Sequence, residues 1–290
     1  MKTEIRTVLS QLFVALQLVL PHHLLSRCVA VLATSRIEWL KNFLIRRFIA
    51  AFRVDMTEAV DPVAENYAHF NDFFTRALCE GVRPVDAAPE AIVSPADGAV
   101  SQLGAIEVGN LMQAKGHWFS AAELLASEAD ARLFHGGSFA TVYLSPRDYH
   151  RVHMPVDATL RSMRYVPGRL FSVNRVTTEG VPRLFARNER LVCLFDTERG
   201  PMGMVLVGAM IVAGIETVWS GPVTPARRSA LHFGYDDAAP GPELCKGQEM
   251  GRFQLGSTVI LLFPRETVTW EAELAAGSTL RMGQRIGSRV

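Results

Sequence analysis

The chain has 290 residues, a formal net charge of +1 and four cysteines. This length is sufficient to bury a substantial hydrophobic core, as one large domain or as a domain with an appended segment. The cysteines, at positions 28, 79, 193 and 245, form no close pair and show no metal-ligand spacing, which argues against a disulfide scaffold and favours a reducing compartment.

The near-neutral net charge conceals a basic N-terminal segment. Residues 1–53 contain eight Lys or Arg and two Glu, a balance of +6, so residues 54–290 carry −5. From Arg36 to Arg53 the arginines lie opposite an apolar helical face, on which only Lys41 is charged. That face comprises Ile37, Leu40, Leu44, Phe48, Ala51 and Phe52. We expect residues 1–60 to lie in a membrane interface as an amphipathic helical segment or, alternatively, to pack as a helical hairpin on the core or on a partner subunit.

No transmembrane span is predicted. The apolar run Leu12–Leu20 contains Gln17 and stops at Pro21, short of the roughly 20 residues that a span needs. The twelve residues Met204–Ile215 are typical of a buried strand. The basic N-terminus resembles the start of a signal peptide, but no small-residue cleavage site follows it.

Residues 61–290 have the pattern of a β-rich domain. Asn66–Leu78 has helical spacing, Arg83–Pro89 has the composition of a linker, and Ala121–Leu133 is predicted to be the one clear helix after it. Short β-rich runs separated by Gly, Pro and Asp cover Ala99–Leu103, Ala140–Leu144, Leu191–Phe195, Met204–Trp219 and Ser257–Phe263. This order predicts an α+β fold with a predominantly antiparallel, sandwich-like β core.

Two polar segments supply candidate catalytic side chains. Asp97 lies in the turn sequence Ser-Pro-Ala-Asp-Gly, and His150 and His153 lie between prolines that argue against a helix. On a regular strand the odd spacing would direct the two rings to opposite faces, so a shared site requires a bend. The simpler interpretation is a turn aspartate and two core or surface histidines. We expect no metal site, because no cysteine or third histidine lies at ligand spacing.

The bond between Gly256 and Ser257 enters an apolar run and could cleave itself. The Ser257 hydroxyl would attack the Gly256 carbonyl, which a residue without Cβ leaves open, and turn the amide into an ester. Loss of the Ser257 Cα proton would expel the Gly256 carboxylate and leave dehydroalanine, which hydrolyses to ammonia and a pyruvoyl group. The motif alone is weak, because Gly277-Ser278-Thr279 repeats it, and it needs an activating base with an orienting group.

Six further segments make the combination specific. They are FNDFFTR at 70–76, PADG at 95–98, KGH at 115–117, YHRVHMP at 149–155, PGRLFSVN at 167–174 and KGQEMGRF at 246–253. With Gly256-Ser257 they make the chain resemble the bacterial phosphatidylserine decarboxylase proenzymes over nearly its whole length.

The resemblance implies that Asp97, His153 and Ser257 form the self-cleaving relay, and that Ser257 rather than Ser278 becomes the pyruvoyl group. Cleavage would give a β chain of residues 1–256 and an α chain of residues 257–290. The pyruvoyl group would form a Schiff base with phosphatidylserine and yield phosphatidylethanolamine and CO₂ without pyridoxal phosphate.

Two further assignments concern the substrate. His150 is the candidate proton donor to the product carbon, because it neighbours the relay histidine without being needed for cleavage. Phe171, Ser172 and Asn174 are candidates to contact the headgroup or to line the lipid entrance, with a plain loop as the alternative.

The expected setting is the cytoplasmic side of the cell membrane, to which the protein would bind peripherally to reach phosphatidylserine. We expect an α/β heterodimer from one chain, which could pair into a dimer of heterodimers, and no metal or nucleic-acid partner. A serine hydrolase could use the same three residues, but no Gly-x-Ser-x-Gly sequence surrounds Ser257. A soluble pyruvoyl amino-acid decarboxylase would not need the basic N-terminus, and a non-catalytic membrane-binding module would leave the polar motifs unexplained.

Overall fold

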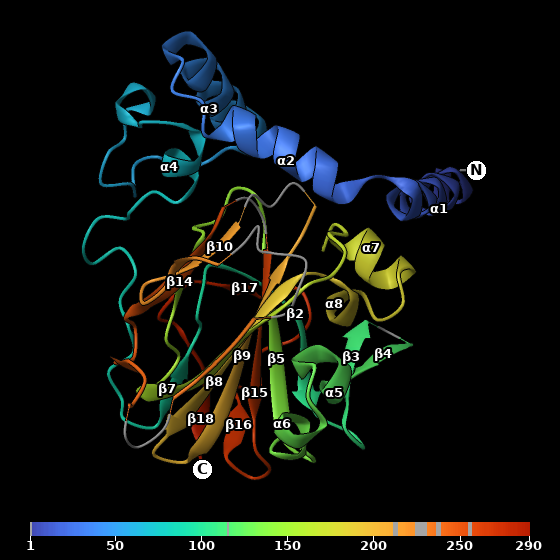
Figure 1. Ribbon diagram of the computed structural model, residues 1–290, viewed down its shortest axis with the longest axis vertical. Coiled ribbons are helices and arrows are strands. Elements are labelled where there is room, and N and C mark those ends of the chain that lie inside the picture. Colours follow the sequence, from blue (N-terminus) through green and yellow to red (C-terminus); the bar gives the residue numbers. More distant parts are fainter. Residues whose placement is uncertain (1, 115, 211–213, 224–230, 236–238, 255–256) are drawn as a thin grey trace.

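The computed structural model describes residues 2–114, 116–210, 214–223, 231–235, 239–254 and 257–290, with side chains from Ser10 onward. Gly256, half of the predicted cleavage site, therefore lies outside the described residues. Figure 1 shows a β-rich body covered at one end by the N-terminal helices, with the C-terminus at the other end.

Eight α-helices and one short 3₁₀ helix are formed within the described residues. They are α1 (Lys2–Val19), α2 (His22–Ala33), α3 (Glu38–Phe52), η1 (Ala64–Asn66), α4 (Phe70–Phe74), α5 (Ala121–Leu125), α6 (Glu128–Arg132), α7 (Arg175–Gly180) and α8 (Leu184–Arg187).

Half of the strands within the described residues belong to one nine-stranded sheet. In spatial order it contains β12 (Leu231–Gly234), β7 (Ala158–Val166), β8 (Arg190–Thr197), β9 (Gly200–Gly208), β15 (Ser257–Phe263), β5 (Ser138–Leu144), β2 (Gly98–Ala105) and β17 (Thr279–Leu280), with β13 (Glu243–Leu244) also paired to β7.

The remaining strands form smaller sheets. One has the order β11 (Gly221–Pro222), β10 (Gly214–Thr217), β14 (Glu249–Gln254) and β6 (Arg151–His153), and another has the order β1 (Ala91–Val93), β18 (Arg285–Arg289) and β16 (Val268–Trp270). β3 (Asn110–Ala114) pairs with β4 (His117–Ser120). The pairings between these strands are antiparallel.

The central strand β15 is buried on both faces. It lies between β9 and β5, and all its residues are buried. Val259, Leu261 and Phe263 join an apolar core shared with β1, β6 and β14, whereas Ile260 and Leu262 join a second core shared with α5 and α8. This alternation follows the pleat of a strand between two layers. The predicted α+β fold with a sandwich-like antiparallel core is confirmed.

Two predicted helices are shorter than expected. Only Phe70–Phe74 of Asn66–Leu78 is α-helical, since Asn66 ends the 3₁₀ helix η1 and Leu78 forms a β-bridge with Ala59. The predicted single helix Ala121–Leu133 is instead α5 and α6, separated by Ala126, whose φ of 52° is left-handed. Ser127 then caps the N-terminus of α6, since its side chain accepts a hydrogen bond from the Asp130 amide. With α7 and α8, this region therefore has more than the one helix expected.

The predicted strand Met204–Trp219 is divided between two sheets. β9 continues to Gly208 in the nine-stranded sheet, whereas β10 starts at Gly214 in the four-stranded sheet. The apolar run therefore contributes to both layers of the sandwich.

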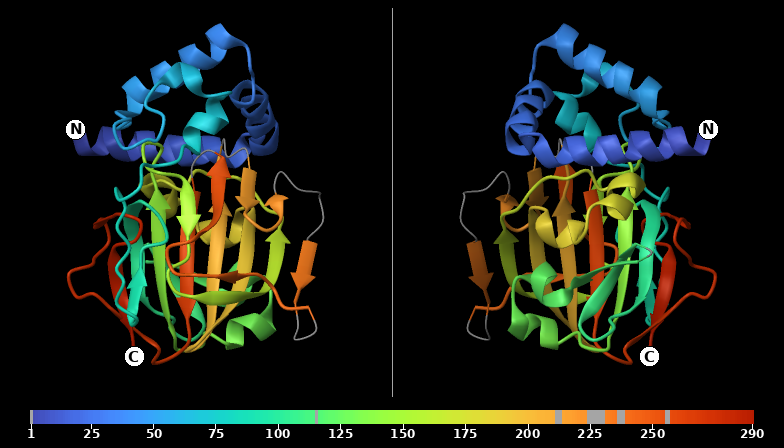
Figure 2. Two further views of the ribbon diagram at one scale, coloured as in Figure 1. Left: turned by 90° about the vertical axis from the view of Figure 1, so that its left-hand side faces the viewer. Right: turned by 90° about the vertical axis from the view of Figure 1, so that its right-hand side faces the viewer.

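The helices α1 to α4 form a layer over one end of the strands, as both views of Figure 2 show. An apolar cluster holds this layer together through Ile45, Phe70, Phe73 and Phe74, with Leu44 and Phe48 of the predicted apolar face packed against it. Lys41 is buried and donates a hydrogen bond to the Glu65 carbonyl at 2.7 Å. Part of the predicted membrane face of α3 therefore packs inward.

Other large apolar side chains of this layer are exposed. They include Leu12, Leu16, Leu24, Val31, Ile37, Trp39, Phe43 and Phe52. Within the described part of the chain no single helix is long and apolar enough to cross a membrane, although Ser10–Val19 and His22–Ala33 together meet the length and composition, with an 89° bend between them.

Candidate active site

Ser257 is the first residue of β15 and lies opposite Leu144 of β5 and Gly208 of β9. Its side chain is completely buried, and its Oγ has no hydrogen-bonding partner within the described residues. Because side chains alternate along a strand, Ser257 faces the same side as Val259, which is the side of the core to which β6 contributes. The hydroxyl is thus held in a water-poor position toward the histidine strand.

Asp97 lies in the turn between β1 and β2 and is tightly held. Its Oδ1 accepts hydrogen bonds from the Met282 amide and from Arg83 Nε, both at 2.8 Å, and its Oδ2 accepts one from Arg83 Nη2 at 2.6 Å. The next residue is Gly98, where a Cβ would lie only 2.2 Å from the carbonyl oxygen of Tyr143. The turn therefore approaches β5 too closely for any residue but glycine.

His153, the last residue of β6, is joined to this turn through the backbone. Its amide donates to the Pro95 carbonyl at 2.7 Å, two residues before Asp97. Its Nδ1 lies 2.8 Å from the Gly247 carbonyl, and its Nε2 lies 3.2 Å from the Tyr149 hydroxyl. Burial lowers the pKa of His153, although the Gly247 hydrogen bond opposes that effect. The ring is thus a neutral base with Nδ1 protonated and Nε2 as the acceptor.

The three residues predicted to form the relay make no direct side-chain hydrogen bonds to one another within the described residues. Within the described residues, Asp97 is bound by Arg83 rather than by His153, and His153 Nε2 faces Tyr149 rather than Ser257. Asp97 nevertheless influences the titration of His153, as a lesser effect after burial, so the two side chains are within electrostatic range.

His150 precedes β6, so the pleat of that strand does not set its direction. The side chain is completely buried against Phe74, with ring centroids 4.0 Å apart. Nδ1 lies 2.7 Å from the Asp148 carbonyl, and Nε2 has no partner within the described residues. Burial lowers the pKa of His150 to about 3. The ring is therefore neutral at physiological pH and offers the lone pair of Nε2.

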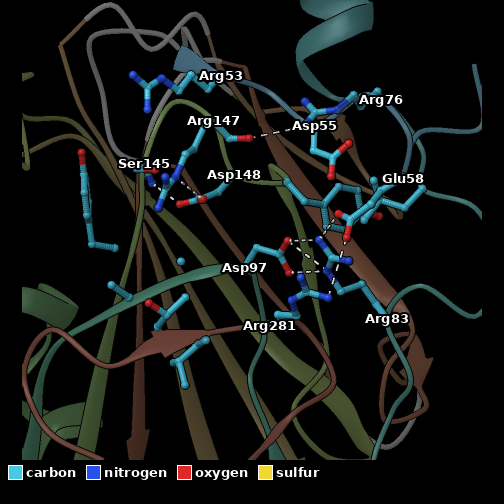
Figure 3. A pocket seen from close by; sticks show the side chains of 17 residues that line it. Arg53, Asp55, Glu58, Arg76, Arg83, Asp97, Ser145, Arg147, Asp148 and Arg281 are labelled. Carbon is cyan, nitrogen blue, oxygen red and sulfur yellow. Dashed lines mark hydrogen bonds and ion pairs between the residues drawn. The ribbon is translucent and has the colours of Figure 1, made fainter. Parts of the chain in front are cut away.

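A cavity of about 370 Å³ adjoins Asp97 and is shown in Figure 3. Its charged lining residues are Arg53, Asp55, Glu58, Arg76, Arg83, Asp97, Arg147, Asp148 and Arg281. Arg83 connects Asp97 to Glu58, since its Nη2 lies 2.6 Å from a carboxylate oxygen of each. The Asp97 hydrogen bonds raise the pKa of Arg83, and Arg83 lowers the pKa of Glu58.

The sequence analysis missed Arg83 and Arg76. Arg83 lies in the stretch interpreted as a linker, and its partners are 14 and 25 residues away in the chain. Arg76 ends the FNDFFTR segment, so the family motif was the one available signal for it.

The candidate substrate residues 171–174 contact the N-terminal helices. Phe171 meets the His22 ring edge-on at 5.1 Å between centroids, and the Ser172 amide donates to Gln17 Oε1 at 2.9 Å. Asn174 caps α7 by accepting a hydrogen bond from the Thr177 amide at 3.1 Å. These contacts tie the loop to the helical layer, and its contact with a headgroup stays a prediction.

A serine nucleophile, a histidine base and a carboxylate serve covalent catalysis when they come within hydrogen-bond reach, and in the described structure Ser257 faces the layer to which His153 belongs without yet making that contact. Within the described residues no group of three or more His, Cys, Asp or Glu is arranged to hold a metal ion.

Comparison with known proteins identifies the family. The family model for phosphatidylserine decarboxylase matches residues 70–288, and a second model, described as PSD, matches residues 12–53. Three relatives are each described as a phosphatidylserine decarboxylase proenzyme. That of Ectopseudomonas mendocina (strain ymp) is 62% identical over 280 residues, covering 96% of this chain and 98% of the relative. That of Stutzerimonas stutzeri (strain A1501) is 62% identical over 279 residues, covering 96% and 94%. That of Pseudomonas putida (strain GB-1) is 60% identical over 283 residues, covering 97% and 99%.

The chain therefore belongs to the phosphatidylserine decarboxylase family. The predicted family and the predicted enzyme class, a carboxy-lyase, are confirmed.

Proposed function

We propose that this chain is a proenzyme that cuts itself between Gly256 and Ser257 and then decarboxylates phosphatidylserine to phosphatidylethanolamine. The observation that carries the proposal is the state of Ser257, whose hydroxyl is buried without a partner in the described structure at the start of the central strand. A hydroxyl that forms a structural hydrogen bond would be harder to activate as a nucleophile.

The strand register supports a relay in which a histidine bridges the carboxylate and the serine. Ala99 of β2 pairs with Tyr143 of β5, which pairs in turn with Thr258 of β15. Two strand spacings, about 10 Å, therefore separate the Asp97 turn from Ser257, too far for direct contact. His153 bonds to that turn and belongs to the layer that Ser257 faces. Self-cleavage would require its Nε2 to turn from Tyr149 to the Ser257 hydroxyl.

The pyruvoyl group formed at position 257 would supply an electrophilic carbonyl that captures the substrate amine and takes up the electrons released with CO₂. The unpartnered Nε2 of His150 suits proton transfer in this reaction. Because burial keeps the ring of His150 neutral at rest, the ring would have to gain a proton, which the substrate ammonium releases as the Schiff base forms, before it could protonate the product carbon. It would thus act as a base before it acts as the predicted donor.

A peripheral position on the cytoplasmic face of the membrane fits the N-terminal layer. The net charge of +6 on residues 1–53 attracts anionic headgroups, and the exposed side chains of Leu16, Trp39 and Phe43 in the same segment can enter the interface. The enzyme would then meet its lipid substrate without crossing the bilayer.

Mass spectrometry of the denatured protein tests self-cleavage. We expect a fragment of residues 1–256 and a 34-residue fragment, 257–290, with a carbonyl-bearing N-terminus. Ser257→Ala, His153→Ala and Asp97→Asn should remain uncut, because each removes the nucleophile, the base or its orienting group.

Ser278→Ala is the matched control, since Gly277-Ser278 repeats the dipeptide, and it should cleave normally. An uncut wild-type chain that nevertheless hydrolyses esters would favour the serine hydrolase instead. Cleavage that persists in Ser257→Ala would refute the assignment.

A further inference from the structure

Arg76 is a buried guanidinium with little to bind. Its side chain is 5% exposed, and its Nε and Nη1 have no hydrogen-bonding partner within the described residues. Nη2 makes one long hydrogen bond, 3.4 Å, to the Arg147 carbonyl, and the Phe73 ring lies 5.5 Å from the guanidinium carbon. Burying a charge without an opposite charge or a full set of hydrogen bonds is costly.

The other charges of the cavity emphasise this exception. Arg83 is paired with Asp97 and Glu58, Arg281 lies 3.7 Å from Glu58, and Arg147 lies 3.7 Å from Asp148. Arg76 and Arg53 line the same cavity without an ion pair in the described structure, but Arg53 is exposed to solvent whereas Arg76 is buried. A guanidinium beside a cavity, with its Nε and Nη1 donors unused within the described residues, can donate hydrogen bonds to an oxyanion, with these two donors on different edges of the group.

Arg76 is also linked, through Phe74, to the proposed proton carrier His150, which is not itself among the described residues that line the cavity. Phe74, two residues before Arg76, is in contact with the His150 ring. Burial is the main cause of the lowered pKa of His150, and the positive charge of Arg76 adds to it, so the two groups are within electrostatic range.

We propose that Arg76 binds the phosphodiester of the substrate headgroup in this cavity. The proposal rests on the proposed function and adds to it the residue that recognises the phosphate. A guanidinium held on the substrate carboxylate would oppose decarboxylation, because it stabilises a charge that the reaction removes. The phosphodiester keeps its charge throughout, so binding it positions the carbon to be protonated near His150 without this penalty.

Binding to the full-length Ser257→Ala protein tests the site independently of catalysis. The probes are glycerophosphoethanolamine, which has the phosphodiester but no carboxylate, L-serine, which has the carboxylate but no phosphate, and inorganic phosphate. Arg76→Gln should weaken the binding of glycerophosphoethanolamine roughly tenfold or more, since a charge-assisted pair is lost. Arg76→Lys should weaken it less, and Arg161→Gln, which removes an arginine paired with Asp196 elsewhere, should have no effect.

Stability separates a ligand site from a structural role. If the role of Arg76 is to bind an anionic ligand, Arg76→Gln should leave the thermal unfolding midpoint of the unliganded protein unchanged or raise it. A lower midpoint together with unchanged probe affinity would mean that Arg76 supports the fold. Binding of L-serine or inorganic phosphate that depends on Arg76, with none of glycerophosphoethanolamine, would also overturn the assignment.

Turnover distinguishes this proposal from the proposed function. With Ser257 intact, Arg76→Gln should still self-cleave, and its KM for phosphatidylserine in mixed micelles should rise roughly tenfold with a smaller change in kcat. If wild-type protein neither cleaves nor decarboxylates, the proposed function fails. If wild-type protein does both and Arg76→Gln has a wild-type KM, only the phosphate site fails.

Discussion

The β core buries its apolar side chains, whereas the N-terminal helical layer leaves many of its apolar side chains exposed. Every residue of β15 is buried, and its side chains alternate between two cores. Helices α1 to α3 of the layer, in contrast, leave Leu16, Trp39 and Phe43 exposed while Lys41 is buried. The core completes its own packing, whereas the layer presents an apolar, basic surface. The difference suggests that the chemistry belongs to the core and access to the lipid belongs to the layer.

The two regions meet at His150. Phe74 of the layer packs on the His150 ring, and the His150 backbone carbonyl accepts a hydrogen bond from the Phe253 amide of β14. A second contact joins the regions, since the Ser172 amide of a core loop donates a hydrogen bond to Gln17 of α1. The two regions therefore differ in composition but are in direct contact. The following predictions test the role of each region.

The largest effect is expected from His150→Asn. Asparagine can keep the hydrogen bond to the Asp148 carbonyl but cannot carry a proton, so the variant should self-cleave to an appreciable extent and lose roughly a hundredfold or more in product formation. Intact mass measures the first step, and phosphatidylethanolamine released per cleaved chain measures the second. A cleaved variant with wild-type turnover would show that the proton comes from another group.

Much of the core could be predicted from local sequence. The apolar run after Ser257 predicted a buried strand, and the Ser-Pro-Ala-Asp-Gly turn placed Asp97 at a strand junction. The break at Ala126 was also signalled, since Ser127 precedes Asp130 with the spacing of a helix N-cap. It was outweighed by the apolar periodicity on either side.

The ion-pair network could not be predicted in this way. Arg83 lies in a Pro- and Asp-containing stretch whose composition is that of a solvated linker, yet only 7% of its side chain is exposed, between Asp97 and Glu58. Arg76 is buried by aromatic residues of α4 rather than by a charge partner. Such positions depend on which distant segments meet, and a pattern of residue types along the chain does not encode that.

An intermediate effect concerns acid stability. The pKa of His150 falls from 6.5 to about 3 on folding because of burial, so the folded state favours the neutral ring. The unfolded chain binds a proton below pH 6.5 and the folded chain does not, so stability present above pH 6.5 is lost as pH falls toward 3. Between pH 7 and 5 this amounts to about 2 kcal/mol.

Urea unfolding of the uncut Ser257→Ala protein at the two pH values measures the loss. His150→Asn in that background should lose roughly 2 kcal/mol less between them. Asp148, whose pKa is raised by burial, and His153, whose pKa is lowered by burial, are present in both proteins and cancel in the comparison. His135→Asn, which removes an exposed histidine, should behave like its parent. Equal acid sensitivity with and without His150 would contradict the buried neutral ring.

The smallest effect is expected at the membrane surface, and the structure makes it specific to one of two adjacent arginines. Arg46 pairs with Glu65, so part of its charge is already balanced, whereas Arg47 is exposed and forms no ion pair in the described structure. Each basic residue near an anionic surface contributes about 1 kcal/mol, so Arg47→Glu should weaken binding to phosphatidylserine-containing vesicles roughly tenfold, and Arg46→Glu should weaken it less.

Added salt should weaken wild-type binding but leave an apolar part that Trp39→Ala reduces, because screening does not affect insertion. Co-sedimentation with vesicles measures all of these, and binding that is indifferent to salt and to every one of these substitutions would place the membrane contact outside the helical layer.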